Sequence, residues 1–248
     1  MTNSATGNTT GGFTGTGGTG VASVTNNIGT GTGQGGSLAR FTIAHGHLYV
    51  VDESQLYTYS LANPQSPVRT SAIPVGISVE TIYPFKDKLF IGSQQAMFIY
   101  SLASPGTPVM EGQASHVRAC DPVVANDSVA YVTVRTGSMC GGGVNALLVY
   151  NIRNLANPVQ VASIPLTNPA GLGLGANNRL YVCDGTAGLR VFSLTNPHQP
   201  VETKLVTGHT FTDIIALDDL LVCGIEDGTA LFTVAANDDI QFAARVAD

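Results

Sequence analysis

The chain has 248 residues, of which 44% are hydrophobic and only 11% are charged. Average soluble domains carry about 25% charged residues, so this surface must rely on Ser, Thr, Asn, Gln and Gly, a composition that favours a secreted or surface protein. The 11 basic and 17 acidic residues give a net charge of −6 without a basic stripe, which argues against a nucleic-acid partner. No apolar run approaches the roughly 18 residues of a membrane-spanning helix, so we expect no transmembrane segment.

Residues 1–37 have a composition of their own. Twelve of them are Gly and ten are Thr, and none is Asp, Glu, Lys or Arg. Such a segment buries too little apolar area to offset the entropy of ordering it, so we expect a flexible leader or tether. It lacks the cationic start and apolar core of a signal peptide. A coil of this kind resembles the tether of a bacterial lipoprotein, which would require a lipid anchor upstream of Met1.

A short apolar run recurs five times after the leader. The first residues of successive runs are 41, 41, 50 and 40 positions apart, and the runs occupy residues 48–51, 89–92, 130–133, 180–183 and 220–223. Each run follows one short strand and precedes a second apolar run. In the first four copies a Pro-containing turn and a further strand come next. Each copy therefore contains four predicted strands, A to D.

Four strands in about 41 residues are typical of a β-propeller blade. One four-stranded sheet cannot bury both of its faces, whereas five arranged around an axis can. The sequence thus predicts an all-β, five-bladed β-propeller with four antiparallel strands per blade, and a β-sandwich is the less favoured alternative. Ring closure would rest on packing between blades one and five, unless residues 21–37 add an edge strand. The domain covers residues 38–248, with repeats at 38–76, 77–118, 119–168, 169–210 and 211–248.

Several runs of the repeat have a familiar sequence. The run Leu-Tyr-Val-Val-Asp at 48–52 precedes "LYTYSLANPQSPV", and "NPAGLGLGANNRLYVCDGTAGLRVFSLTNP" follows later. These segments resemble the LVIVD-repeat β-propeller proteins, which are bacterial and often lipoproteins of Bacteroidetes. The resemblance covers about residues 38–248. It implies a propeller in an extracytoplasmic location (the cell surface, outer membrane or periplasm), but it brings no functional residue with it.

The strand order predicts where a site would lie. With strand A innermost, the D–A and B–C connections share one face, and by analogy with other propellers sites collect there around the channel. The acidic residues of this mouth could bind a polar ligand or a structural cation, but the favoured interpretation is that Asp and Gly there shape turns and cap strand ends. A nine-residue insertion around residues 136–144 lies on the same face. The candidate ligand-binding residues at the channel mouth are Arg40, Glu80, Asp121, Arg135, Asp184 and Asp213.

The four cysteines fall into two pairs. Cys120 and Cys140 lie on the same predicted face of the third copy, so we expect a disulfide between them. Cys183 and Cys223 take equivalent strand B positions and are expected to be buried free thiols. No C-x-x-C or H-E-x-x-H motif is present, so we predict no metal site and no cofactor other than a structural cation at the mouth.

No G-x-S-x-G nucleophile motif is present either. The sequence therefore favours a non-catalytic, extracytoplasmic or surface-tethered binding or scaffold module with a protein or carbohydrate ligand. The alternative is an enzyme that processes a carbohydrate or a small polar ligand with carboxylates such as Glu80 and Asp121.

Overall fold

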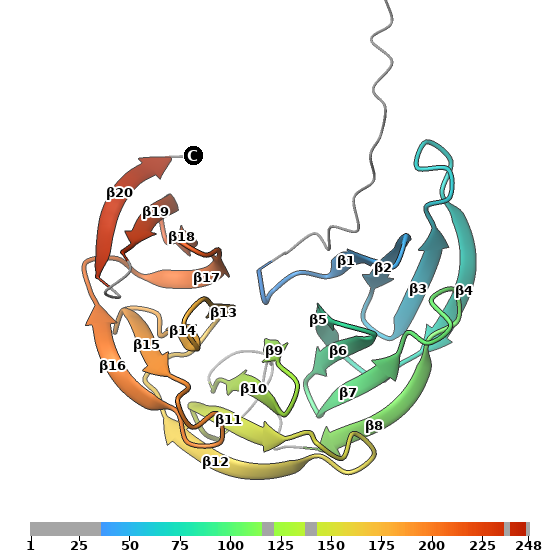
Figure 1. The fold of residues 1–248 in the computed structure, drawn as a ribbon, viewed down its shortest axis with the longest axis horizontal. Helices are drawn as coiled ribbons and strands as arrows, with labels where there is room; N and C mark the ends of the chain where they lie inside the picture. Colours follow the sequence, from blue (N-terminus) through green and yellow to red (C-terminus); the bar gives the residue numbers. More distant parts are fainter. Residues whose placement is uncertain (1–35, 116–121, 137–142, 236–238, 247–248) are drawn as a thin grey trace, which may run out of the picture.

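The computed structural model describes residues 36–115, 122–136, 143–235 and 239–246, and all of their regular secondary structure is β-strand. Twenty strands form five antiparallel sheets of four, which we call blades 1 to 5 in chain order (Figure 1). Within each blade the strands are adjacent in the order in which the chain makes them.

The strands of successive blades have the following bounds. They are β1 (Phe41–Ala44), β2 (His47–Val51), β3 (Gln55–Ser60) and β4 (Val68–Pro74); β5 (Val79–Phe85), β6 (Lys88–Ser93), β7 (Ala96–Ser101) and β8 (Val109–Ser115); β9 (Val123–Ala125), β10 (Val129–Val134), β11 (Ala146–Asn151) and β12 (Val159–Pro165); β13 (Leu172–Gly175), β14 (Arg179–Cys183), β15 (Leu189–Ser193) and β16 (Val201–Val206); and β17 (Phe211–Ala216), β18 (Leu220–Ile225), β19 (Gly228–Val234) and β20 (Ile240–Val246).

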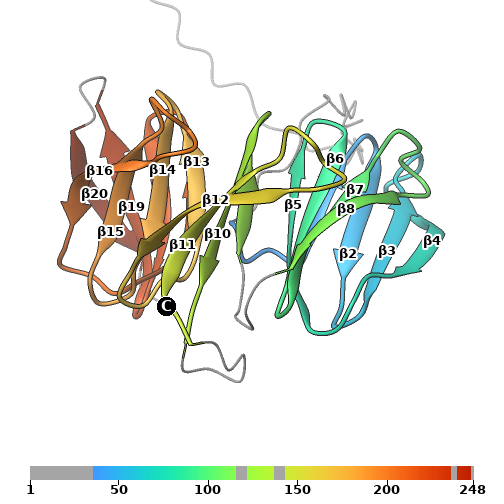
Figure 2. The same ribbon diagram turned by 90° about the horizontal axis from the view of Figure 1, so that it is seen from below.

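The five blades stand around a common axis. The first strand of each blade is innermost, and β1 contacts β5, β5 contacts β9, β9 contacts β13 and β13 contacts β17. Figures 1 and 2 show the fourth strands, from β4 to β20, on the outside of this array. The predicted all-β class, the five copies and the four strands per copy are confirmed.

Every blade carries a β-bulge at the same place, which the sequence analysis did not predict. The pairing between the third and fourth strands shifts by one residue just before an aromatic residue, namely Tyr59, Tyr100, Tyr150, Phe192 and Phe232. An extra residue on one strand increases the local right-handed twist. The bulge therefore helps to twist the outer part of each blade.

Successive blades are joined by large aromatic side chains of their second strands. Tyr49, Phe90, Tyr131 and Tyr181 are at most 3% exposed. The Tyr49 hydroxyl donates to the carbonyl of Pro105 in the next blade at 2.9 Å, and Tyr131 donates to Pro197 at 2.8 Å. We call this contact the Tyr–Pro latch. The first proline of these turns therefore has a structural role. Its backbone carbonyl accepts the hydrogen bond that the tyrosine of the preceding blade donates.

Blade 3 has no proline at that place, and blade 2 has Phe90 at the position of the tyrosine. Leu155 takes the position of the first turn proline and packs against the cluster that contains Phe90. Tyr49 and Tyr131 thus donate to a proline carbonyl, whereas the Phe90 ring has an apolar side chain, Leu155, in the corresponding turn.

The fifth copy has a different register from the one predicted. Leu217 N–H donates to the Leu220 carbonyl, which closes a two-residue turn like the one between Phe85 and Lys88 in blade 2. Leu220 thus corresponds to Lys88, and the true steps between copies are 41, 41, 50 and 41 residues. The prediction that Cys183 and Cys223 are equivalent is wrong.

Cys183 and Cys223 lie in one cluster between blades 4 and 5. Both are buried free thiols, as predicted. Burial raises the pKa of Cys223 to about 12 and raises that of Cys183 strongly, so both remain protonated and unreactive at neutral pH.

A Tyr131→Phe substitution tests the latch. It removes the donor for the Pro197 carbonyl and should lower the free energy of unfolding by about 1 kcal/mol in urea denaturation. Tyr59→Phe, at a half-buried ring of β3, should change it by less than about 0.5 kcal/mol. Equal effects of the two changes would contradict the latch.

Candidate functional site

A small pocket opens at the channel mouth, on the face formed by the D–A and B–C connections. Its volume is about 150 Å³. Four blades contribute to it together with the segment before blade 1, so the predicted location of the mouth agrees with the structure. The lining residues are Leu38, Glu80, Pro122, Arg135, Asn168, Pro169, Ala170, Gly185, Thr210, Phe211 and Thr212.

Two of the predicted site residues, Glu80 and Arg135, line this pocket. Glu80 is the second residue of β5 and accepts a hydrogen bond from the Gln94 side-chain amide at 3.4 Å. Arg135 follows β10 directly and is half-buried. Phe211, which is fully buried, contributes an apolar surface beside them. The pocket therefore combines an acidic and a basic group from neighbouring blades with an apolar wall.

Arg40 has a structural contact instead. Its guanidinium donates to the Val79 carbonyl of blade 2 at 2.6 Å, and it is not among the pocket-lining residues. It belongs to residues 36–40, which we call the strap. Ala39 in the strap accepts a hydrogen bond from Ile82 N–H at 2.9 Å, also in blade 2.

The strap also reaches blades 4 and 5. The Ser37 hydroxyl accepts a hydrogen bond from Leu172 N–H at 2.8 Å and donates to the Asp213 carboxylate at 3.3 Å. Ser37 is 2% exposed. Residues 36 and 37 were predicted to belong to the flexible leader, but the structure makes them part of the domain.

Asp213 holds the strap in place. Its carboxylate accepts backbone hydrogen bonds from Ser37 and Leu38, and burial raises its pKa above the ordinary value. Gly36 and Gly171 lie against this carboxylate so closely that a Cβ at either position would overlap it. Asp213 is not among the pocket-lining residues. We call its hydrogen bonds between blade 5 and the strap the Asp213 clamp.

Asp184 is likewise engaged in structural contacts. Its buried carboxylate accepts hydrogen bonds from the backbone of Thr167 at 2.9 Å and of Asn168 at 2.7 Å. Arg190 donates its Nε to the same carboxylate at 2.7 Å and a second nitrogen to Glu202 at 2.8 Å. The interaction fixes the connection that enters blade 4, next to the pocket.

Asp121, Cys120 and Cys140 lie outside the described residues, as does most of the insertion of the third copy. The disulfide and the contribution of Asp121 to the mouth stay predictions. Within the part of the chain that the structure describes, no three His, Cys, Asp or Glu side chains are grouped to hold a metal ion. The same part contains no helix that could cross a membrane.

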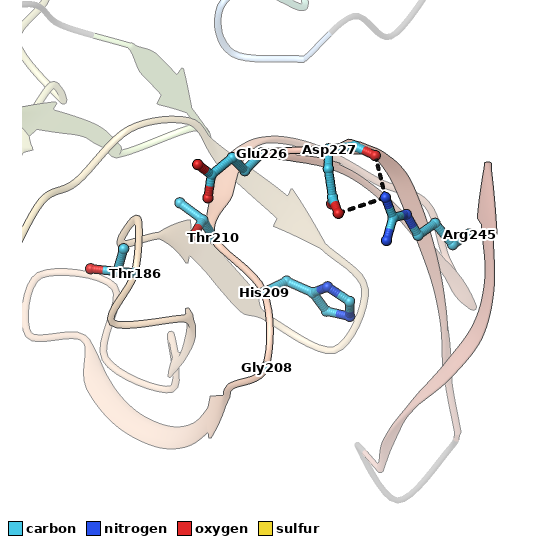
Figure 3. A pocket seen from close by; sticks show the side chains of 7 residues that line it. All are labelled: Thr186, Gly208, His209, Thr210, Glu226, Asp227 and Arg245. Carbon is cyan, nitrogen blue, oxygen red and sulfur yellow. Dashed lines mark hydrogen bonds and ion pairs between the residues drawn. The ribbon is translucent and has the colours of Figure 1, made fainter. Parts of the chain in front are cut away.

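A second, wider groove of about 610 Å³ lies beside blade 5 (Figure 3). His209 lines it, with its ring stacked on Phe242 at 5.8 Å between centroids. Arg245 is paired with the Asp227 carboxylate at 2.6 Å, while Glu226 points away from this pair (Figure 3). His209 lies in the D–A connection between β16 and β17.

No protein family model and no curated protein matches the chain. Solved structures do match in fold. A Lactobacillus plantarum protein has a TM-score of 0.65 at 11% identity, over 83% of this chain and 69% of that one. A periplasmic gluconolactonase of Pseudomonas aeruginosa has 0.61 at 14%, over 81% and 69%. Citrobacter koseri AztD has 0.61 at 10%, over 82% and 61%.

At these identities the likeness shows the fold alone, and the neighbours are β-propeller-like proteins. The chain spans about two thirds of the length of these neighbours.

The pH dependence of stability tests the Asp213 clamp. Because the folded pKa lies above the ordinary value of 3.8, protonated Asp213 stabilises the fold at low pH, and that stability is lost as the pH rises through the folded pKa. Asp213→Asn keeps an acceptor without titrating, so the Tm of the variant relative to wild type should increase between pH 4 and pH 7. Parallel profiles would contradict the assignment.

Asp213→Ala is the matched control for that experiment. It removes the acceptor at every pH and should lower the free energy of unfolding by about 1–3 kcal/mol.

Arg190→Met tests the buried ion pair. It leaves the Asp184 carboxylate buried without its cation, which should cost about 3–5 kcal/mol in urea denaturation. Lys204→Met breaks the more exposed Lys204–Asp239 pair and should cost at most about 1 kcal/mol. A cost for Arg190→Met no larger than that of the control would show that Asp184 does not depend on this partner.

Proposed function

We propose that the chain is a five-bladed propeller module that binds a partner without catalysing a reaction, and that the mouth pocket receives a small polar group of that partner. The observation that carries the proposal is the convergence of Glu80 and Arg135 beside the apolar wall of a pocket of about 150 Å³. Sites that enclose a whole small molecule usually measure roughly 300–1,000 Å³. A pocket of this size suits one sugar ring or one polar side chain that protrudes from a larger ligand.

The same proposal places the module outside the cytoplasm, tethered to a bacterial surface. Three features support this: the low share of charged residues, the Gly/Thr-rich leader and the resemblance to LVIVD-repeat proteins. One fold neighbour is described as periplasmic. A lipid anchor upstream of Met1 would complete the tether, and a protein or carbohydrate of the cell envelope is the partner that we propose.

Binding is tested with a panel of mono- and oligosaccharides and of short polar peptides, by ligand-observed NMR. Arg135→Ala and Glu80→Gln should each weaken binding of any ligand found by at least about tenfold, because loss of a hydrogen bond to a charged group costs about 1.5–3 kcal/mol. The matched control is Arg153→Ala, in a turn on the opposite face. Binding that survives both mouth variants, or that Arg153→Ala weakens equally, would contradict the proposal.

An enzymatic role is the second candidate. It is favoured by the Glu80 carboxylate in the pocket and by the gluconolactonase among the fold neighbours. Turnover of a lactone or glycoside that falls at least about 100-fold in Glu80→Gln would support this role, and turnover unchanged in that variant would remove the mouth as its site.

A further inference from the structure

The groove beside blade 5, which we call the blade 5 groove, adjoins the pocket at the channel mouth. Thr210 lines both of them. Gly185 lines the pocket, and the next residue, Thr186, lines the groove. Phe211 N–H donates to the Gly185 carbonyl at 3.1 Å, so a backbone hydrogen bond between blades 5 and 4 holds this border in place. A ligand bound in the pocket therefore has the groove directly beside it.

The lining of the blade 5 groove offers both donors and acceptors. Thr186 and Thr210 each carry a hydroxyl, Glu226 carries a carboxylate and His209 carries an imidazole. A hydroxyl both donates and accepts hydrogen bonds, a carboxylate accepts them, and an imidazole donates through at least one ring nitrogen. The groove can therefore exchange hydrogen bonds with a ligand that is rich in hydroxyl groups.

Three phenylalanine rings hold His209 in place. The centroids of Phe211, Phe232 and Phe242 lie 5.9, 6.0 and 5.8 Å from that of the imidazole. Within the part of the chain that the structure describes, neither ring nitrogen of His209 has a hydrogen-bond partner. Because the ring is half-buried and packed on several sides, its nitrogens are pre-organised to bind a ligand.

Glu226 offers a free acceptor, whereas its neighbour Asp227 is already engaged. Arg245 donates to the Asp227 carboxylate at 2.6 Å and to the Asp227 carbonyl at 2.7 Å. Figure 3 shows the Glu226 carboxylate pointing away from this pair, toward the side of Thr210. The Glu226 side chain makes no hydrogen bond to another described residue. It is therefore available to accept from a ligand hydroxyl.

The charges along the pocket and the groove do not favour an anionic ligand. Arg245 and Asp227 neutralise each other in the groove, and Glu80 and Arg135 have opposite charges in the pocket. Of the Asp, Glu and Arg side chains that line the two, Glu226 is left without an opposite charge. A negative charge on the ligand would be repelled there.

The usual modes of peptide recognition do not suit this groove. A peptide that adds a strand needs an exposed sheet edge, and an amphipathic helix needs an apolar groove. Six of the seven lining residues lie in connections between strands, and only Arg245 belongs to a strand. An acidic peptide motif needs a cluster of Arg side chains, whereas Arg245 is paired with Asp227.

The pocket of about 150 Å³ suits one sugar ring, and the groove adds about 610 Å³ beside it. Sites that enclose a whole small molecule measure roughly 300–1,000 Å³, so the two together have room for a longer ligand. We propose that the blade 5 groove binds the continuation of a neutral oligosaccharide whose terminal sugar enters the mouth pocket. Glu226 and His209 bind the hydroxyl groups of this continuation. The inference rests on the ligand-binding role proposed for the mouth.

The first test compares sugars of increasing length by NMR titration. The probes are α-1,4- and β-1,4-linked oligosaccharides of glucose, and β-1,4-linked ones of mannose, xylose and N-acetylglucosamine, each with one to four sugar units. In at least one series the Kd should fall at least about tenfold from the monosaccharide to the tetrasaccharide, because the added sugars form further hydrogen bonds. A tetramer of galacturonic acid should bind at least about tenfold more weakly than the best neutral tetrasaccharide.

The second test changes the groove. Glu226→Gln and His209→Phe, which keeps the aromatic packing, should each weaken binding of the tetrasaccharide at least about tenfold and leave the Kd of the monosaccharide within about twofold. The matched control is His198→Ala, a half-buried histidine in the turn between β15 and β16 on the opposite face. It should change neither Kd. Arg135→Ala should weaken binding of both sugars.

The outcomes separate this inference from the role of the mouth. An affinity that does not rise with length in any series, or that is highest for galacturonic acid or for a peptide, would overturn the oligosaccharide. Monosaccharide binding that needs Arg135 would then still support the mouth. A tetrasaccharide that needs Glu226 and His209 but not Arg135 would instead support the groove and overturn the mouth as the site of the terminal sugar.

Discussion

The structure depends on apolar packing between successive sheets. Four hydrophobic clusters account for most of the buried side chains, and each lies between two blades that follow one another in the chain. A four-stranded sheet has no core of its own, so every blade relies on its neighbours for burial. At the first three interfaces the second strand supplies a large ring, and the following blade supplies the turn that receives it.

This dependence explains why the fold is readable from the sequence. An apolar run that recurs at a nearly constant step specifies both the strand and its partner, because all interfaces use the same positions. The predicted register was wrong in the fifth copy, where a shift of one residue decides it. In the fifth copy Leu220 and Leu221 are both apolar, so composition could not show which one matches Leu89. Only the turn at Asp218 and Asp219 reveals it.

The mouth was harder to predict in detail than the fold. The strand order placed Glu80 and Arg135 on the correct face, and both line the pocket. It could not show that Arg40 and Asp213 contact the backbone of other segments instead. A sequence gives the face on which a charged residue lies, whereas its role depends on which polar groups surround it. One sequence feature could have predicted the bulges. An aromatic residue recurs in each third strand at the point where the pairing shifts.

The strap joins elements that are far apart in the chain. Ser37 bonds to Leu172 and Asp213, which follow it by 135 and 176 residues. Contacts between consecutive blades are comparatively local and can form as each repeat emerges, whereas contacts with a large sequence separation form slowly. Ala39 and Arg40 can dock on blade 2 early, whereas Ser37 has to wait for its partners in blades 4 and 5. Until those two blades have folded, the strap is held at one end only, and the pocket at the channel mouth is incomplete.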